Sequence, residues 1–345
     1  MEAVLKNLAN TVELLAVAAH SCAVNQWDKQ TVSRAFHWAK YCEHIYSRFH
    51  TNSTIRRVME KQLQLTNQSL RDAIPAYSEV SFTDLPRCQH LLLVRLLKNP
   101  ELPSSVMRIF FETKSAVNDA PCEYEDIRGL CSHMIEHRSA CKVLSPVSGA
   151  SAVGADAEVQ GEMLMERLGA LLSQNTNPHL AEHFLCSVLP LFEGTAQHLC
   201  LVITAALLTP KDSATQTASQ DFLLDWLLKK DNVLQYMCSL LPSTLLKDLA
   251  KEHLKFREAY CGVLKQWASD MKYSVNDGEW GQTSTDPPVS FQNITKHFQT
   301  LFEACPSMRA STEDELRALR ISNGDFDVRG LSVWGDLLSA IKGQK

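Results

Sequence analysis

Residues 28–49 read DKQTVSRAFHWAKYCEHIYSRF, and this stretch indicates the fold class. Apolar side chains recur in it at every third or fourth position, a spacing that places them on one side of an α-helix. They are Val32, Ala35, Phe36, Ala39, Cys42, Tyr46 and Phe49. The opposite side is polar, so the sequence predicts a helix that begins after Asp28, ends near Phe49 and buries one face.

The same pattern, followed outward along the chain, predicts helices in most other segments. In the first half they cover about 1–20, 54–70, 84–97, 104–114 and 123–144. In the second half they cover about 162–172, 178–189, 195–208, 221–229, 232–240, 244–250, 254–272, 291–302, 312–319 and 331–342. Gly and Pro number only 13 each, which argues against a sandwich or barrel because those folds need frequent turns. The predicted fold class is therefore all-α.

Two segments resemble each other and suggest how the helices are arranged. HFLCSVLP at His183–Pro190 and QYMCSLLP at Gln235–Pro242 lie 52 positions apart, and each reads as a helix end stopped by proline. Helix pairs that repeat at such periods are typical of an α-solenoid. We therefore expect HEAT-like helix pairs that stack on one another.

A change in composition predicts a division of the chain. Residues 145–159 read SPVSGASAVGADAEV, a small and polar stretch without an aromatic residue, as expected of a linker. It would join an N-terminal helical domain at 1–144 to a C-terminal helical-repeat domain at 160–345. Pro210–Gln220 is rich in Ser and Thr and is predicted to be an exposed loop.

Charge and cysteine usage narrow the class of protein. The formal net charge of the 345 residues is -5, so the chain lacks the basic bias of a dedicated nucleic-acid-binding protein. Its 11 Cys include no C-x-x-C pair, which favours a reducing compartment. The longest uncharged apolar stretch, Leu199–Leu208, falls short of the ~20 residues that span a membrane. Five cysteines in apolar helical stretches are predicted to be buried: Cys42, Cys88, Cys186, Cys200 and Cys238.

One short motif raises the hypothesis of a zinc hydrolase. HMIEH at His133–His137 has the inverted zinc-protease spacing, with Glu136 beside the two His, and Cys141 follows one turn later. A solvated, charged helix face explains the same residues, and a lone motif in a chain with 12 His is weak. The glycine-rich and nucleophile motifs of common enzyme folds are absent. We therefore predict no enzyme, no cofactor and no metal site.

Basic side chains gather on the polar side of the 28–49 helix and in the segment after it. They suit either a phosphate backbone or an acidic protein surface, although most charged helix faces are simply solvated. They are Arg34, His37, His44, Arg48, Arg56, Arg57 and Lys61. A direct DNA-binding helical module is therefore the alternative to a protein-binding one.

Candidate partner-binding residues lie near both ends of the chain, because aromatic residues dominate interface hot spots. NGDFDVRG at Asn323–Gly330 is rich in turn residues, so Phe326 and Val328 are expected to be exposed there. Trp334 is a further candidate. The favoured role for it, however, is to pack its short helix against the core of the protein. In the N-terminal half the candidates, on or near the non-core side of the 28–49 helix, are Trp38, Tyr41, His44 and Arg48.

These segments, taken in order, resemble the Fanconi anemia group F protein family. Thr31–Tyr41, preceded by Trp27, is similar to the family's N-terminal region. Gly324–Asp327 and Gly330–Trp334 are similar to its C-terminal region. The resemblance covers nearly the whole chain and is poor in the predicted linker and in the predicted 210–220 loop.

The resemblance implies a helical, non-enzymatic adaptor of the Fanconi anemia core complex, a nuclear ubiquitin ligase assembly that repairs DNA interstrand crosslinks. It implies that the N-terminal half binds the group C and E proteins and that the C-terminal half binds the group A and G proteins. It also implies docking of the group M translocase, with the ligase activity held by another subunit. A nuclear protein with no membrane contact and no direct nucleic-acid contact is therefore expected.

Overall fold

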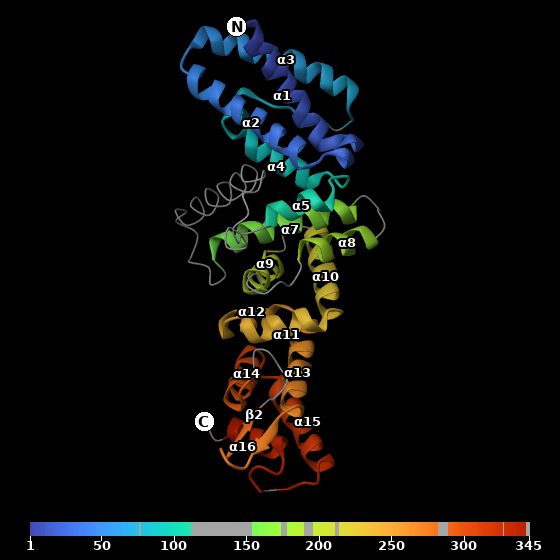
Figure 1. Ribbon diagram of the computed structural model, residues 1–345, viewed down its shortest axis with the longest axis vertical. Coiled ribbons are helices and arrows are strands. Elements are labelled where there is room, and N and C mark those ends of the chain that lie inside the picture. The colour runs from blue at the N-terminus through green and yellow to red at the C-terminus, as the bar shows by residue number, and fades with distance from the viewer. Residues whose placement is uncertain are drawn as a thin grey trace. The chain divides into compact units, whose positions relative to one another are not determined.

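The computed structural model describes residues 1–75, 77–111, 154–173, 178–189, 196–210, 214–281, 289–326 and 328–342. Nearly all regular structure within them is helical, which confirms the predicted all-α class (Figure 1). Contacts divide the chain into two compact units, each described here by itself. The first unit takes Met1–Gly149, Glu158–Thr195 and Ser213–Ser219, and the second takes Ala150–Ala157, Ala196–Asp212 and Gln220–Lys345.

Three long helices open the first unit, with a short 3-10 helix at Cys22–Gln26 after the first of them. They are α1 (Glu2–His20), α2 (Lys29–Phe49) and α3 (Ser53–Ala73). The carboxylate of Asp28 caps α2 by accepting the N–H of Thr31 at 2.7 Å, and the Asn52 side chain caps α3. The predicted core face of α2 is buried through Cys42, and Ile45 continues it.

The helix predicted at 84–97 is two elements in the structure. A 3-10 helix, η2 (Phe82–Arg87), precedes α4 (Cys88–Lys98). The carboxylate of Asp84 accepts the N–H of Ser81 at 3.0 Å, so the first of these elements begins after Ser81, earlier than predicted. Pro86 lies inside η2 and has no N–H for an α-helical bond, which explains the break.

Helix α5 (Ser104–Phe111) follows and accounts for the first part of the helix predicted at 104–114. The end of that prediction and the helix predicted at 123–144 lie outside the described residues.

Arg167 on α7 (Ala155–Ser173) forms hydrogen bonds with the segment that follows α4. Its guanidinium donates to the carbonyl oxygens of Pro100 at 2.9 Å and Leu102 at 3.1 Å, and also to that of Asn99. The side chain is buried, and this burial lowers the pKa of Arg167 to about 10. The carbonyl oxygens offset the cost of burying the charge, so α7 and α8 (Pro178–Val188) belong with the N-terminal helices.

The predicted linker at 145–159 is described only in part. Its last residues, 155–159, form the beginning of α7, whereas 145–153 lie outside the described residues. The division into domains at 1–144 and 160–345 stays a prediction. The chain changes between the compact units after residues 149 and 157, both within this stretch, and residues 158–195 are grouped with the N-terminal helices.

The second unit is built from seven helices of its own among the described residues, and α12 packs against both α13 and α14 (Figure 1). Helix α11 ends at Leu240, and Pro242 directly precedes α12, so this helix end is stopped by proline as predicted. The stacking of such pairs into a solenoid stays a prediction. The helices are α9 (Ala196–Leu208), α11 (Asp231–Leu240), α12 (Ser243–Glu252), α13 (Leu254–Ser269), α14 (Phe291–Ala304), α15 (Met308–Ser322) and α16 (Val333–Lys342).

The loop predicted at 210–220 is wrong, because α10 (Ala214–Leu228) begins inside it. The small polar residues of α10 allow it to pack closely on α7 at Gly169. A Cβ atom added to Gly169 would lie 3.6 Å from the side chains of both Thr215 and Ser219. Buried Gln220 donates to the carbonyl oxygens that end α9, including that of Thr209 at 2.8 Å. Ser219 and Gln220 are therefore buried with hydrogen-bond partners, whereas Thr215 stays exposed as predicted.

A two-stranded antiparallel hairpin, which the sequence analysis missed, follows α13. Strand β1 (Lys272–Ser274) pairs with β2 (Glu279–Gly281), and Tyr273 lies opposite Trp280. Helix α13 accordingly ends at Ser269, short of the predicted 272. Gly278 closes the turn with φ +68°, a conformation that favours glycine.

Cysteine burial agrees with the prediction at four of five positions. Cys42, Cys88, Cys200 and Cys238 are buried, whereas Cys186 is exposed on α8. The prediction for Cys186 is therefore wrong, because its position faces outward on a helix with only one buried side. None of the described helices combines the length and the apolar character that crossing a membrane requires.

Candidate partner-binding surfaces

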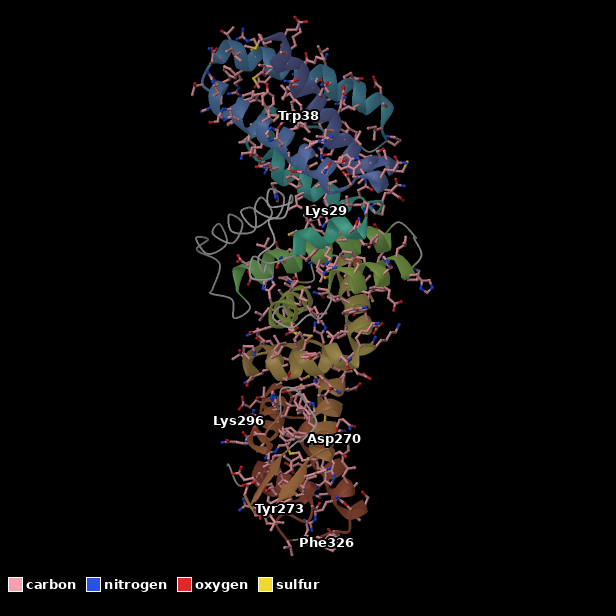
Figure 2. The ribbon with its side chains drawn as sticks, viewed as in Figure 1. Lys29, Trp38, Asp270, Tyr273, Lys296 and Phe326 are labelled. Atoms are coloured by element: carbon pink, nitrogen blue, oxygen red, sulfur yellow. The ribbon has the colours of Figure 1, made fainter. Side chains whose placement is uncertain are left out.

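The predicted N-terminal residues share one side of α2, which we call the α2 surface: Arg34, His37, Trp38, Tyr41, His44 and Arg48. At 100° per residue they fall within about a third of the helix circumference. Trp38 is 41% exposed and packs edge-on against Tyr41, with 5.6 Å between the ring centroids (Figure 2). Asn7 of α1 donates to the Tyr41 hydroxyl at 3.4 Å. Neighbouring contacts therefore hold the two rings while Trp38 stays partly exposed.

The α2 surface is positively charged. All three exposed Lys or Arg side chains of α2 (Arg34, Lys40 and Arg48) form no ion pair within the part of the chain that the structure describes. Glu43, the one carboxylate on α2, turns inward, where its Oε1 accepts the backbone N–H of Gln89 at 2.8 Å. Burial raises the pKa of Glu43. The outward charge of this helix is therefore basic only.

The predicted C-terminal residues lie on the connection between α15 and α16, which we call the C-terminal loop (323–332, with Asp327 outside the described residues). Phe326 is 49% exposed and Val328 is 63% exposed, as expected for contact residues. Leu331 on the loop and Ile321 at the end of α15 are exposed as well. The loop therefore presents several apolar side chains to solvent.

Hydrogen bonds order the first part of this loop. Asp325 has φ +52°, and its backbone N–H donates to the carbonyl of Arg320 at 3.1 Å. The Arg320 guanidinium donates to the Asp325 carboxylate at 2.9 Å. Gly324 (φ +103°) leaves room for the ring of Phe326, which would lie 2.3 Å from a Cβ at that position. Phe326 is therefore held in place although half of it is exposed.

Asp336 of α16 holds the second part of the loop. One carboxylate oxygen accepts the N–H of Gly330 at 2.8 Å and the indole N–H of Trp280 at 2.7 Å. Gly330 lies against Tyr273, whose ring a Cβ would approach to 2.5 Å. Tyr273 and Phe326 are labelled at the same end of the second unit (Figure 2). The missed hairpin thus supports the candidate surface.

Trp334 is buried and only 6% exposed, together with Val333, Leu337, Leu338 and Ile341 of α16. The structure therefore gives it the closing role that the sequence favoured, and not direct exposure to a partner. The hydroxyl of Ser332 accepts the N–H of Gly335 at 3.5 Å and so caps α16.

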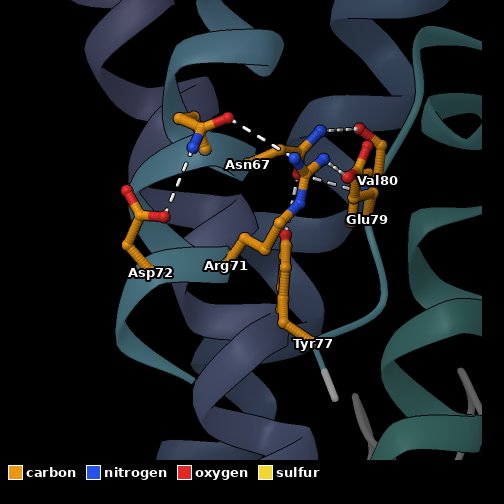
Figure 3. Close-up of polar contacts among 7 residues, drawn as sticks. Asn67, Arg71, Asp72, Tyr77, Glu79 and Val80 are labelled. Atoms are coloured by element: carbon orange, nitrogen blue, oxygen red, sulfur yellow. Dashed lines mark hydrogen bonds and ion pairs between the residues drawn. The ribbon is translucent and has the colours of Figure 1, made fainter. Parts of the chain in front are cut away.

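A third polar feature lies in the first unit, where the extended residues 77–81 attach to α3 (Figure 3). The Asn67 amide donates to the carbonyl of Val80 at 2.9 Å and accepts the N–H of Val80 at 3.2 Å. Tyr77 donates to the same Asn67 oxygen at 2.8 Å, and Arg71 pairs with Glu79. An open groove of about 320 Å³ beside this attachment is lined by Glu60, Leu63, Gln64, Asn67, Glu79, Val80, Ser81, Phe82 and Thr83.

No metal centre is found in the described residues, where no three His, Cys, Asp or Glu side chains come together to hold an ion. The zinc-like motif of His133, Glu136 and His137, with Cys141, lies outside those residues. The hypothesis that rests on it gains no support from the structure.

Helices make up nearly all of the regular structure in the described residues, which places the chain in the class of all-α proteins. Within that class, the chain belongs to the Fanconi anemia group F protein family, whose model matches residues 1–341. It is similar to the human Fanconi anemia group F protein, with 30% identity over 99% of this chain and 95% of the human one. It is also similar to the mouse protein, with 28% identity over 99% of this chain and 98% of that one.

Family membership makes the chain a component of the Fanconi anemia pathway, to which the predicted DNA-repair role belongs. It also implies association with other Fanconi anemia proteins.

Proposed function

We propose that this chain is a non-enzymatic adaptor of the nuclear Fanconi anemia core complex, the ubiquitin ligase assembly that acts on DNA interstrand crosslinks. The α2 surface binds the group C and E proteins, and the C-terminal loop binds the group A and G proteins. The group M translocase docks on the assembled adaptor. Family membership and the two separate exposed surfaces support this function.

The observation that carries the proposal is the ordered exposure of the C-terminal loop. Exposed apolar side chains on a loop without ordering hydrogen bonds are common. Phe326 and Val328 instead lie on a loop whose conformation is stabilised by hydrogen bonds to the side chains of Arg320 and Asp336. A preordered apolar surface loses little conformational entropy on binding, which favours protein association. A bridge needs at least two such surfaces, and the α2 surface is the second.

The test uses two variants of the full-length chain. Phe326→Ser combined with Val328→Ser should abolish co-purification of the group A and G proteins and leave the group C and E proteins bound. Trp38→Ala should show the reverse. Each loss is expected to reach about tenfold in affinity or more, because truncated hot-spot residues cost about 2 kcal/mol. Quantitative mass spectrometry of the purified assemblies measures both.

Leu254→Ser is the matched control, because Leu254 is 59% exposed in the second unit and lies away from the C-terminal loop in sequence. It should leave all four partners bound. Retention of every partner by both test variants would contradict the assigned surfaces, and failure of the unmutated chain to retain any of them would contradict the adaptor role itself.

A further inference from the structure

Positive charge is concentrated in residues 29–61 of a chain that is acidic overall. This segment holds seven Lys and Arg against two Glu, a net of +5, whereas the whole chain carries -5. Both glutamates already have partners: Glu43 accepts the N–H of Gln89, and Glu60 pairs with Arg56 at 2.8 Å. Neither pairs with Arg34 or Arg48, although the exposed carboxylate of Asp28, which caps α2, interacts electrostatically with Arg34.

The α2 surface has the dimensions of a helix-binding face. Arg34 and Arg48 are 14 positions apart, which corresponds to about 21 Å along the helix axis. Trp38 lies between them in sequence and is 41% exposed, with the centroid of the Tyr41 ring 5.6 Å from its own. Its members recur at three- and four-residue steps, the spacing at which a second helix presents side chains along its own length.

We propose that the α2 surface binds an acidic helical segment of a partner protein. Asp or Glu side chains of that segment pair with Arg34 and Arg48, and a small apolar residue between them packs on the Trp38 ring. Carboxylates are favoured because Arg guanidinium groups bind them through two parallel hydrogen bonds. This inference rests on the proposed function, for which it names the chemistry of the N-terminal partner.

Nucleic acid is the competing ligand for a basic and aromatic surface, and the structure favours protein. Helix α1 packs beside α2 and carries exposed Glu2 and Glu13 together with exposed Lys6, so it does not extend the basic surface of α2. A DNA duplex is wider than one helix and would find no further excess of positive charge on α1. A single acidic helix fits on α2 alone.

The experiment measures binding of purified group C and E proteins, added together, to the full-length chain. Arg34→Glu combined with Arg48→Glu should weaken binding at least about thirtyfold, because like charges then face each other across the interface. Raising the salt concentration from about 0.1 M to about 0.5 M should weaken binding to the unmutated chain and not to the variant.

The control is Lys251→Glu combined with Lys296→Glu, which makes the same change of charge at two exposed positions of the second unit. It should bind as the unmutated chain does. Replacing the Asp and Glu of the captured partner segment by Lys should restore binding to the Arg34→Glu and Arg48→Glu variant, which supports the pairing directly.

Two results would overturn the inference while leaving the adaptor role standing. One is undiminished binding of the group C and E proteins by the charge-reversal variant. The other is a charge reversal that abolishes binding of a duplex or single-stranded oligonucleotide and spares the proteins, which would assign the surface to nucleic acid. Absence of group C and E binding by the unmutated chain would instead remove the proposed function, and the inference with it.

Discussion

Asp336 shows how one side chain outside the contact surface can determine its shape. A single carboxylate oxygen accepts hydrogen bonds from the Gly330 backbone and the Trp280 indole, so it links the C-terminal loop to the hairpin. We expect the position of the exposed residues Phe326 and Val328 to depend on this link, because it fixes the backbone of the loop that carries them.

Replacement of Asp336 tests this dependence. Asp336→Ala leaves two part-buried donors without an acceptor and should lower the free energy of unfolding by about 1–3 kcal/mol. Asp336→Asn keeps one acceptor oxygen and should cost less. Urea unfolding of the two variants gives the difference, and co-purification of the group A and G proteins should fall in the same order. Equal stabilities for both variants would show that the carboxylate does not hold the loop.

At the scale of elements, α10 shows what sequence patterns predict and what they miss. Amphipathic helices such as α2 follow from the spacing of apolar residues alone, and its bounds are as predicted. The start of α10 carries Ser, Thr and Gln where a core helix usually has apolar residues, so composition indicated a loop. Only the tertiary partner explains these residues, because Gly169 of α7 leaves room for Thr215 and Ser219.

Gly169 offers a two-sided test of that packing. A Cβ there would lie 3.6 Å from Ser219 and Thr215, which is ordinary contact, so Gly169→Ala should stabilise the chain by about 0.5–1 kcal/mol through helix propensity. Gly169→Leu would place three more carbons in the same space and should destabilise it by about 1–3 kcal/mol. Thermal unfolding measures both. A Leu variant as stable as the Ala variant would mean that α7 and α10 are not closely packed.

Sequence patterns likewise predict the exposed residues of the C-terminal loop but miss the hairpin that supports them. Phe326 and Val328 were predictable as exposed because aromatic and apolar residues among turn formers have no helix face to bury. The hairpin that supports them was not predicted, because each strand has only three residues and no alternation to detect. Its signal is the Asp277–Gly278 turn between two aromatic residues, which a search for hairpins would find.

At the scale of the whole molecule, the chain passes between the two compact units more than once, and two of these changes, after residues 149 and 157, fall in the small-residue stretch of 145–159. Arg167 lies beyond that stretch, yet its guanidinium binds carbonyl oxygens in the segment that follows α4. Residues 158–195 are accordingly grouped with the N-terminal helices. Composition identifies a stretch of small and polar residues. A domain boundary depends instead on which side chains on either side of the stretch contact each other, and a single sequence does not show those contacts.

Fragments of the chain test where the first unit ends. A fragment of residues 1–195 keeps α7, α8 and the Arg167 hydrogen bonds, so it should unfold cooperatively and stay monomeric. A fragment of residues 1–144 exposes the apolar side of α5 and leaves the carbonyl oxygens of Asn99 and Leu102 without their buried donor. It should unfold at a temperature lower by several degrees, about 4–8 °C for each 1 kcal/mol lost, or aggregate. Circular dichroism and sedimentation velocity measure both properties. If the two fragments are equally stable, α7 and α8 are dispensable to the N-terminal helices and the domain boundary predicted at 145–159 is the better description.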